Sequence, residues 1–151
     1  MIDRQRRRRF AGVACVGVVA VVLMGCAAPS PTSQEIRPVE DFAGVPDGTY
    51  APPGTEPGTD YAVWTTDGKH IGIVLFGSSS CPERATKMTV PEGFLESTVA
   101  LAPPDRSKTC TTDSAPHTTL FDAPEFFRAN GSDVMIGLLS GKVVLSHGGG
   151  N

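Results

Sequence analysis

The stretch YAVWTTDGKHIGIVLF, residues 61–76, shows the clearest local structure in this chain. Two runs rich in β-branched and aromatic residues flank Asp67-Gly68, a pair that supplies the positive φ angles of a type I′ hairpin turn. Pairing Thr66 with Lys69 fixes the register, which places Trp64 opposite Ile71 and Ala62 opposite Ile73. One face then carries Trp64, Ile71, Ile73 and Leu75, whereas the face expected nearer water carries Thr65, His70 and Gly72.

Further short β-rich runs follow this hairpin. They cover residues 85–90, 95–101 and 118–121, and a second hairpin over 133–147 turns at Ser140-Gly141. One helical turn is expected after Asp122 as cap, with Asn130-Gly131 as its stop. About seven short strands predict an all-β domain over residues 61–147, a small β-sandwich or partly open barrel, with 148–151 as a flexible tail.

The N-terminus is typical of an export signal, with basic residues before an apolar run over 10–24. At its end, Leu23-Met24-Gly25-Cys26 resembles the bacterial lipobox, although the position of Met24 more often holds a small or β-branched residue. The resemblance implies that residues 1–25 are a signal peptide, cut between Gly25 and Cys26. It also implies a diacylglyceryl group on the Cys26 sulfur, and two acyl chains suffice for stable membrane anchoring.

An alternative is an uncleaved anchor, because residues 10–28 form 19 consecutive uncharged positions, enough to span a bilayer. The basic N-terminus would then stay in the cytoplasm and the rest would be exported. A freely secreted product is a third possibility. The first two predict a domain on the outer face of the cell membrane.

Residues 26–60 are expected to form a disordered linker. Residues 27–60 contain seven Pro and four Gly among 34 positions, a composition with too few apolar groups to offset the entropy of ordering. A flexible chain of this length would span about 30 Å. The pattern leaves open whether one or two of Ile36, Val39, Phe42 and Tyr50 dock on the domain.

The charge of the chain argues against nucleic acid as a partner. Five of the 13 basic and one of the 16 acidic residues lie in the first 25, which leaves eight against 15 and a net charge of −7. The basic residues are scattered singly, so they form no patch that could follow a phosphate backbone. The same acidity excludes electrostatic attraction to anionic lipids.

The positions of the four cysteines suggest different roles for them. Cys15 lies in the apolar N-terminal run and Cys26 is the predicted lipid site, so Cys81 and Cys110 remain, and in an exported protein they most simply form a disulfide. Closing a loop of about 30 residues is worth roughly 3.5 kcal/mol in the chain-entropy model. The disulfide is expected to be structural.

Two catalytic hypotheses centre on the same stretch. VLFGSSSCPER, residues 74–84, resembles the active-site turn of thioredoxin-like oxidoreductases, but Arg84 stands where the second cysteine of C-x-x-C should be. Ser78, Ser79 and Ser80 could supply a nucleophile with His117 and Asp113, yet the second glycine of G-x-S-x-G is missing. A solvated turn is the simpler interpretation.

Metal and cofactor motifs are missing from the sequence. His70, His117 and His147 show no ligand spacing with one another, and the chain has no EF-hand loop, phosphate cradle or dinucleotide fingerprint. No metal or cofactor is therefore expected.

GSSSCP at 77–82 and CTTDSAPHTTLF at 110–121 together resemble a group of small exported proteins and lipoproteins of actinobacteria, whose activity is not established. The resemblance covers about residues 64–138 and implies a β-rich fold with a Cys81–Cys110 disulfide. The sequence thus predicts a lipid-anchored binding or cell-envelope accessory module without catalysis, whose partner is an extracellular protein or envelope component. The alternative is an exported thiol oxidoreductase that uses Cys81.

Overall fold

The computed structural model describes residues 32–105, 107–138 and 140–146. The expected signal peptide 1–25, the cleavage site at Gly25 and Cys26, the alternative anchor 10–28 and the tail 148–151 lie outside them. Nine strands and one helix occur in the described residues: β1 Ser33–Ile36, β2 Pro38–Ala43, β3 Tyr61–Trp64, β4 His70–Gly77, β5 Arg84–Pro91, β6 Glu96–Ala102, β7 Ala115–Asp122, α1 Glu125–Asn130, β8 Val134–Leu138 and β9 Gly141–Leu145.

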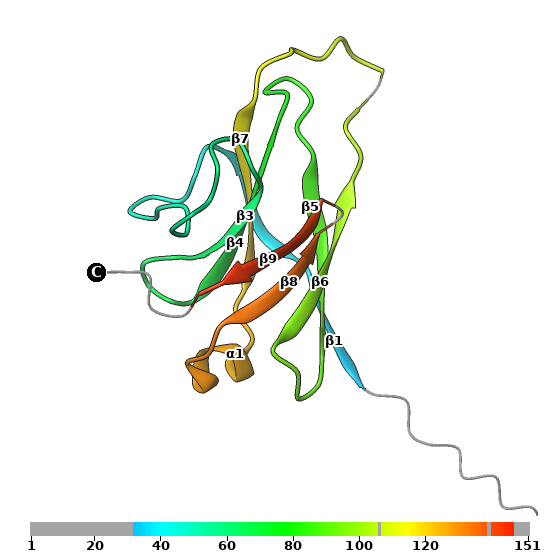
Figure 1. The fold of residues 1–151 in the computed structure, drawn as a ribbon. Coiled ribbons are helices and arrows are strands. Elements are labelled where there is room, and N and C mark those ends of the chain that lie inside the picture. The colour runs from blue at the N-terminus through cyan, green and yellow to red at the C-terminus, as the bar shows by residue number, and fades with distance from the viewer. Residues whose placement is uncertain (1–31, 106, 139, 147–151) are drawn as a thin grey trace, which may run out of the picture.

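The strands form two sheets that pack face to face (Figure 1). One sheet has the order β1-β5-β6-β8-β9, and the other has the order β2-β7-β4-β3. All pairs are antiparallel except β6 with β8. The fold is therefore a two-sheet sandwich and not a closed barrel, which confirms the predicted all-β class. The seven predicted strands are β3 to β9.

The hairpin of β3 and β4 has the predicted register, with Trp64 opposite Ile71 and Ala62 opposite Ile73. The turn type is different from the prediction. A type I′ turn needs positive φ at both central residues, but Gly68 has a φ of 65° and no non-glycine residue in the described chain has a positive φ. The Gly68 amide instead donates to the Thr65 carbonyl at 2.9 Å. Register survives because the apolar face of each strand fixes it.

Apolar side chains from both sheets and from α1 fill the space between the layers. Ile71, Ile73, Met88, Phe121 and Phe127 are completely buried there. Burial of this kind is the main favourable contribution to folding, at roughly 25 cal/mol per Å² of apolar surface. The predicted inward face of the hairpin is thus confirmed, with Trp64 packed against the edge of the core.

The expectation of a disordered linker does not hold for the segment that contains β1 and β2. β1 pairs with β5 in one sheet, and β2 pairs with β7 in the other, so the chain crosses between sheets at Arg37. Both are edge strands whose side chains mostly face water, and edge strands need few apolar residues. Ile36, 8% exposed, is the one core residue they contribute.

The segment between β2 and β3 covers part of the outer face of the four-stranded sheet, which the sequence predicted to lie nearer water. Pro46 packs so closely that a Cβ on Gly72 would lie 3.2 Å from its Cγ. The Thr118 hydroxyl, on the same face, donates to the Gly44 carbonyl at 2.6 Å. Val74 is completely buried there as a result. The covered part of this outer face therefore forms a second, smaller apolar layer outside the main core.

Three turns of similar sequence build this covering segment. Each ends in Gly-Thr, and the glycines at 48, 54 and 58 have φ angles of 70°, 85° and 79°, which glycine adopts without steric cost. The amides of Thr49, Thr55 and Thr59 donate to the carbonyls of Pro46, Pro52 and Glu56. The segment has local hydrogen bonds in place of a sheet. Tyr50, 82% exposed, does not dock on the domain.

Helix α1 closes one end of the sandwich and buries Phe127. The expected cap at Asp122 is wrong, because β7 extends through that residue and Pro124 occupies the N-cap position without a side-chain hydrogen bond. The predicted stop is confirmed: Gly131 has a φ of 58°, a left-handed conformation typical of helix ends. No helix in the described ranges is long and apolar enough to cross a membrane.

Candidate functional site

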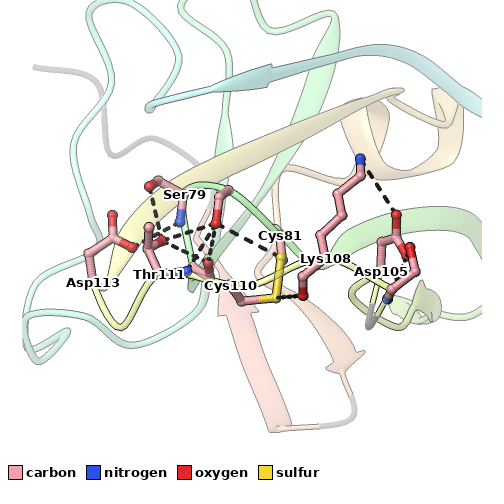
Figure 2. The surroundings of a disulfide bond; sticks show 10 residues. Ser79, Cys81, Asp105, Lys108, Cys110, Thr111 and Asp113 are labelled. Atoms are coloured by element: carbon pink, nitrogen blue, oxygen red, sulfur yellow. Dashed lines mark hydrogen bonds and ion pairs between the residues drawn. A yellow bond between two sulfur atoms is a disulfide. The ribbon is translucent and has the colours of Figure 1, made fainter.

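The Cys81–Cys110 disulfide joins the β4–β5 and β6–β7 connections, which lie at the same end of the sandwich (Figures 1 and 2). The two Cα atoms are 5.4 Å apart, and the bond closes a separation of 29 residues. Cys81 is 4% exposed, whereas Cys110 faces solvent. The predicted disulfide is confirmed. It ties two exposed loops to each other at the end opposite α1.

Hydroxyl groups surround this disulfide. The Ser78 and Thr111 hydroxyl oxygens lie 2.8 Å apart, and the Ser79 and Thr111 hydroxyl oxygens 3.3 Å apart. The Thr111 amide donates to the Ser80 hydroxyl at 3.0 Å. The three serines of the SSSC motif thus bond across to the loop that contains Cys110, and they reinforce the same junction that the disulfide makes.

Asp113 completes this cluster. It accepts a hydrogen bond from the Ser79 amide at 3.1 Å, a contact visible in Figure 2. Hydrogen bonds from the Thr111 and Ser79 side chains, followed by the Ser79 amide, lower the pKa of the Asp113 carboxyl to about 2. The carboxylate is therefore ionised throughout the ordinary pH range, where it fixes the loop as an acceptor.

The geometry separates the groups that a serine triad would require. Asp113 bonds Ser79, whereas the His117 Nε2 lies 2.9 Å from the Asp41 Oδ1. His117 is 8% exposed and points between the sheets, and Ser78 and Ser80 bond to hydroxyls in the exposed loop. The spacing of Ser, Asp and His along the sequence thus does not produce a hydrogen-bonded triad.

The surroundings of Cys81 also differ from a thioredoxin-like active site. A reactive thiolate in such a site lies at a helix N-terminus, which lowers its pKa. Here the chain after Cys81 enters the strand β5 at Arg84. Arg84, the residue in place of the second cysteine, pairs with the Asp41 carboxylate at 2.9 Å.

Asp41 is the centre of a polar network between the sheets that the sequence did not reveal. Its carboxylate accepts hydrogen bonds from His117 and from the Thr119 hydroxyl, each at 2.9 Å, besides its ion pair with Arg84. The Thr119 hydroxyl in turn accepts from the Ala85 amide at 3.3 Å. The network therefore joins strands β2, β5 and β7. The sequence did not predict this pair because Asp41 and His117 are 76 residues apart and the composition around Asp41 is that of a linker.

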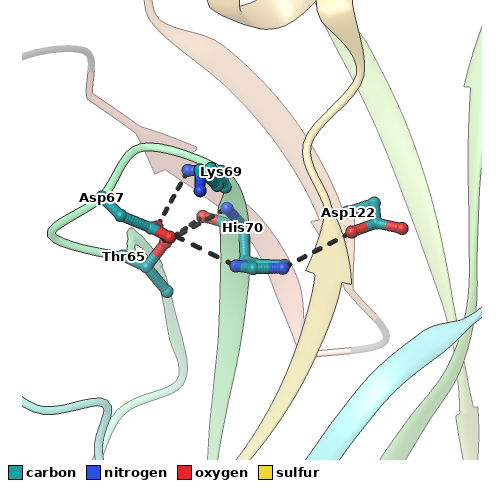
Figure 3. Close-up of polar contacts among 5 residues, drawn as sticks. All are labelled: Thr65, Asp67, Lys69, His70 and Asp122. Carbon is teal, nitrogen blue, oxygen red and sulfur yellow. Dashed lines mark hydrogen bonds and ion pairs between the residues drawn. The ribbon is translucent and has the colours of Figure 1, made fainter.

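His70 borders an open groove of about 550 Å³ on the outer face of the four-stranded sheet. The His70 ring nitrogens lie 3.9 Å from an Asp67 oxygen and 3.5 Å from an Asp122 oxygen (Figure 3). A hydrogen bond from the Thr65 hydroxyl, then one from the Lys69 amide, lowers the pKa of Asp67. Glu40 and Asp47 also line the groove. The groove is therefore lined by acidic side chains, and a cationic group would bind there more favourably than an anion.

The histidines and carboxylates of the described chain do not converge on a metal site. No group of three or more His, Cys, Asp or Glu side chains within residues 32–105, 107–138 and 140–146 could hold an ion. His70 and His117 belong to different contacts, and His147 lies outside the described residues.

Comparisons of the chain with protein-family models, with characterised proteins and with solved structures found no match.

Proposed function

We propose that this protein is a lipid-anchored extracytoplasmic binding or cell-envelope accessory module without catalysis of its own. The carrying observation is the lipobox-like sequence Leu23-Met24-Gly25-Cys26, followed after six further residues by a disulfide-containing β-sandwich that begins at Ser33. Disulfides persist in oxidising compartments outside the cytoplasm. Both features support export, and the lipobox-like sequence supports attachment at the outer face of the cell membrane.

The form of the domain supports a role in binding. A small sandwich presents its loops at two ends and offers exposed surface more readily than an enclosed cavity. The open acidic groove beside His70 and the exposed hydroxyl loops at the disulfide are both accessible to a macromolecule. An extracellular protein or a component of the envelope is the partner class that this surface fits, and the acidic chain disfavours nucleic acid.

The thiol oxidoreductase alternative requires an accessible, low-pKa Cys81 thiolate. Cys81 is 4% exposed, is bonded to Cys110 and precedes a strand. These features favour a structural cysteine. A thiol titration of the folded protein separates the two functions. Two thiols that react only after denaturation and reduction support the binding module, whereas one rapidly reactive cysteine under native conditions would establish the oxidoreductase.

Cell fractionation of two cysteine variants tests the anchor. Cys26→Ala removes the predicted lipid site, and Cys15→Ala is the matched control because Cys15 lies in the segment predicted to be removed. We expect Cys15→Ala to stay in the membrane fraction with the wild-type mass, and Cys26→Ala to accumulate as an unlipidated precursor. Identical masses and identical processing of both variants would overturn the proposal.

A further inference from the structure

The structure places the start of the folded domain much closer to Cys26 than the sequence suggests. Thr32 is the first described residue, and its carbonyl already accepts a hydrogen bond from the Glu92 amide at 2.9 Å. Thr32 follows Cys26 by six residue steps along the chain, and a fully extended chain of this length reaches about 20 Å. A single eight-residue strand such as β4 is about 26 Å long. The connection is therefore shorter than the domain, so the domain stays close to the anchor.

The point at which the chain enters the domain defines one end of the sandwich. The first residues of β1, the β5–β6 turn and α1 lie together at the lower end in Figure 1. Thr32, Pro91, Gly93, Pro124 and Phe126 border a shared hollow of about 440 Å³ there. We call this region, made of the start of β1, residues 91–95 and α1, the anchor end. The disulfide end is formed by residues 78–81 and 110–113.

Two large apolar side chains project at the anchor end. Phe94, at the tip of the β5–β6 turn, is 57% exposed, and Phe126, on α1, is 39% exposed. The Phe94 amide donates to the Pro91 carbonyl, so the turn that carries this residue is closed next to the hollow that Gly93 borders. Aromatic side chains that protrude from a rigid turn suit the boundary between lipid headgroups and acyl chains.

We propose that the anchor end rests on the bilayer surface and that Phe94 and Phe126 insert into the headgroup boundary. This inference rests on the proposed lipid anchor at Cys26. The short connection confines the domain to the bilayer surface, and it joins the domain at the end where the two rings are exposed. The disulfide end then points away from the membrane and is the end presented to a partner.

The anchor end suits electrically neutral lipid, because its two exposed carboxylates outnumber its one basic residue, Arg128 of α1. Glu92 and Glu125 line the same hollow as Phe126 and are exposed. Anionic headgroups would repel these carboxylates. The contact is therefore shallow, with the rings among the headgroups and the carboxylates in water, and it weakens as anionic lipid is added.

Tryptophan quenching in vesicles tests this orientation. The full processed protein, purified with its anchor, is placed in phosphatidylcholine vesicles whose acyl chains carry bromine, a quencher that acts at short range. Phe94→Trp reports the anchor end, and Thr112→Trp, on an exposed residue of the disulfide end, is the matched control. Trp64 is present in both variants, so its fluorescence contributes equally to the two measurements. We expect the added fluorescence to be lost in Phe94→Trp and retained in Thr112→Trp, and phosphatidylserine to reduce the loss.

Three other results would each overturn the orientation. Equal quenching at both positions would mean that the domain has no fixed orientation, and quenching at 112 alone would mean the reverse one. No quenching at 94, with cross-linking of the chains in pairs, would mean that a second copy covers Phe94. The mass of the same sample shows whether the lipid anchor is present. A chain without the diacylglyceryl group would contradict the proposed function itself, whereas the three results above contradict only the orientation.

Discussion

The two ends of the sandwich are held together in different ways. At the anchor end the interior is apolar, with Phe127 of α1 and Phe121 of β7 completely buried. Toward the disulfide end a covalent bond, a cluster of hydroxyls and the Asp41 network connect the strands. The difference indicates that packing fixes the fold at the anchor end, while the cross-links fix the shape of the loops at the disulfide end. Four predictions test this contrast.

Removal of an aromatic ring from the anchor end should give the largest loss of stability. Phe127→Ala deletes a completely buried ring and leaves a cavity, which costs about 3–5 kcal/mol in the free energy of unfolding. Phe126→Ala, one residue earlier on the same helix, removes a ring that is 39% exposed and should cost far less. Denaturant unfolding of both variants measures the difference. Equal losses would mean that packing of α1 is not what secures this end.

Removal of the disulfide should have the next largest effect. Replacing Cys81 and Cys110 together by Ala frees a loop with a separation of 29 residues, and the chain-entropy model gives a loss of roughly 3.5 kcal/mol. Unfolding of this double variant, compared with the oxidised wild type, gives the value. A loss below about 1 kcal/mol would show that the hydroxyl cluster alone orders the disulfide end.

Neutralising Asp41 should have a smaller effect. Asp41→Asn weakens the bonds to His117, Thr119 and Arg84, and hydrogen bonds to a charged group are worth about 1.5–3 kcal/mol. Glu35→Gln is the control because Glu35 forms only an exposed ion pair with Lys87, and such pairs contribute little. Thermal unfolding should separate the two variants. A Glu35→Gln loss as large as that of Asp41→Asn would contradict a central role for the network.

The pH dependence of the disulfide end should show the smallest effect. Hydrogen bonds from Thr111 and Ser79 lower the pKa of Asp113 from 3.8 to about 2 in the folded protein. Because the folded pKa is below the unfolded one, the stabilisation is present above pH 3.8 and is lost as the pH falls to 2. Asp113→Asn should therefore be less stable than the wild type at pH 5, and the gap should close by pH 2. A gap that is independent of pH would contradict this assignment.

Local signals made part of this fold predictable. The hairpin of β3 and β4 was accessible because alternation and register agree within 16 residues, and the register holds although the turn at Gly68 is of another type. The disulfide followed from counting cysteines. Both features depend on residues whose roles are visible without knowledge of the tertiary structure.

The remaining features depend on contacts between distant segments. β1 and β2 are edge strands that bury little besides Ile36, so their composition is that of a linker. Asp41 acquires its role only when β2 pairs with β7 and brings His117 beside it. The repeated Gly-Thr turns were the available signal, because three turns in close succession indicate an ordered covering segment in place of a flexible tether.

The intact mass of the protein from its native membrane, before and after reduction and alkylation, tests whether the chain is a lipid-anchored domain with a structural disulfide. We expect a chain that begins at Cys26 with the added mass of a diacylglyceryl group, and Cys81 and Cys110 alkylated only after reduction. A chain that begins at Met1, or alkylation of Cys81 without reduction, would contradict it and would mean a spanning anchor in the first case or a reactive thiol in the second.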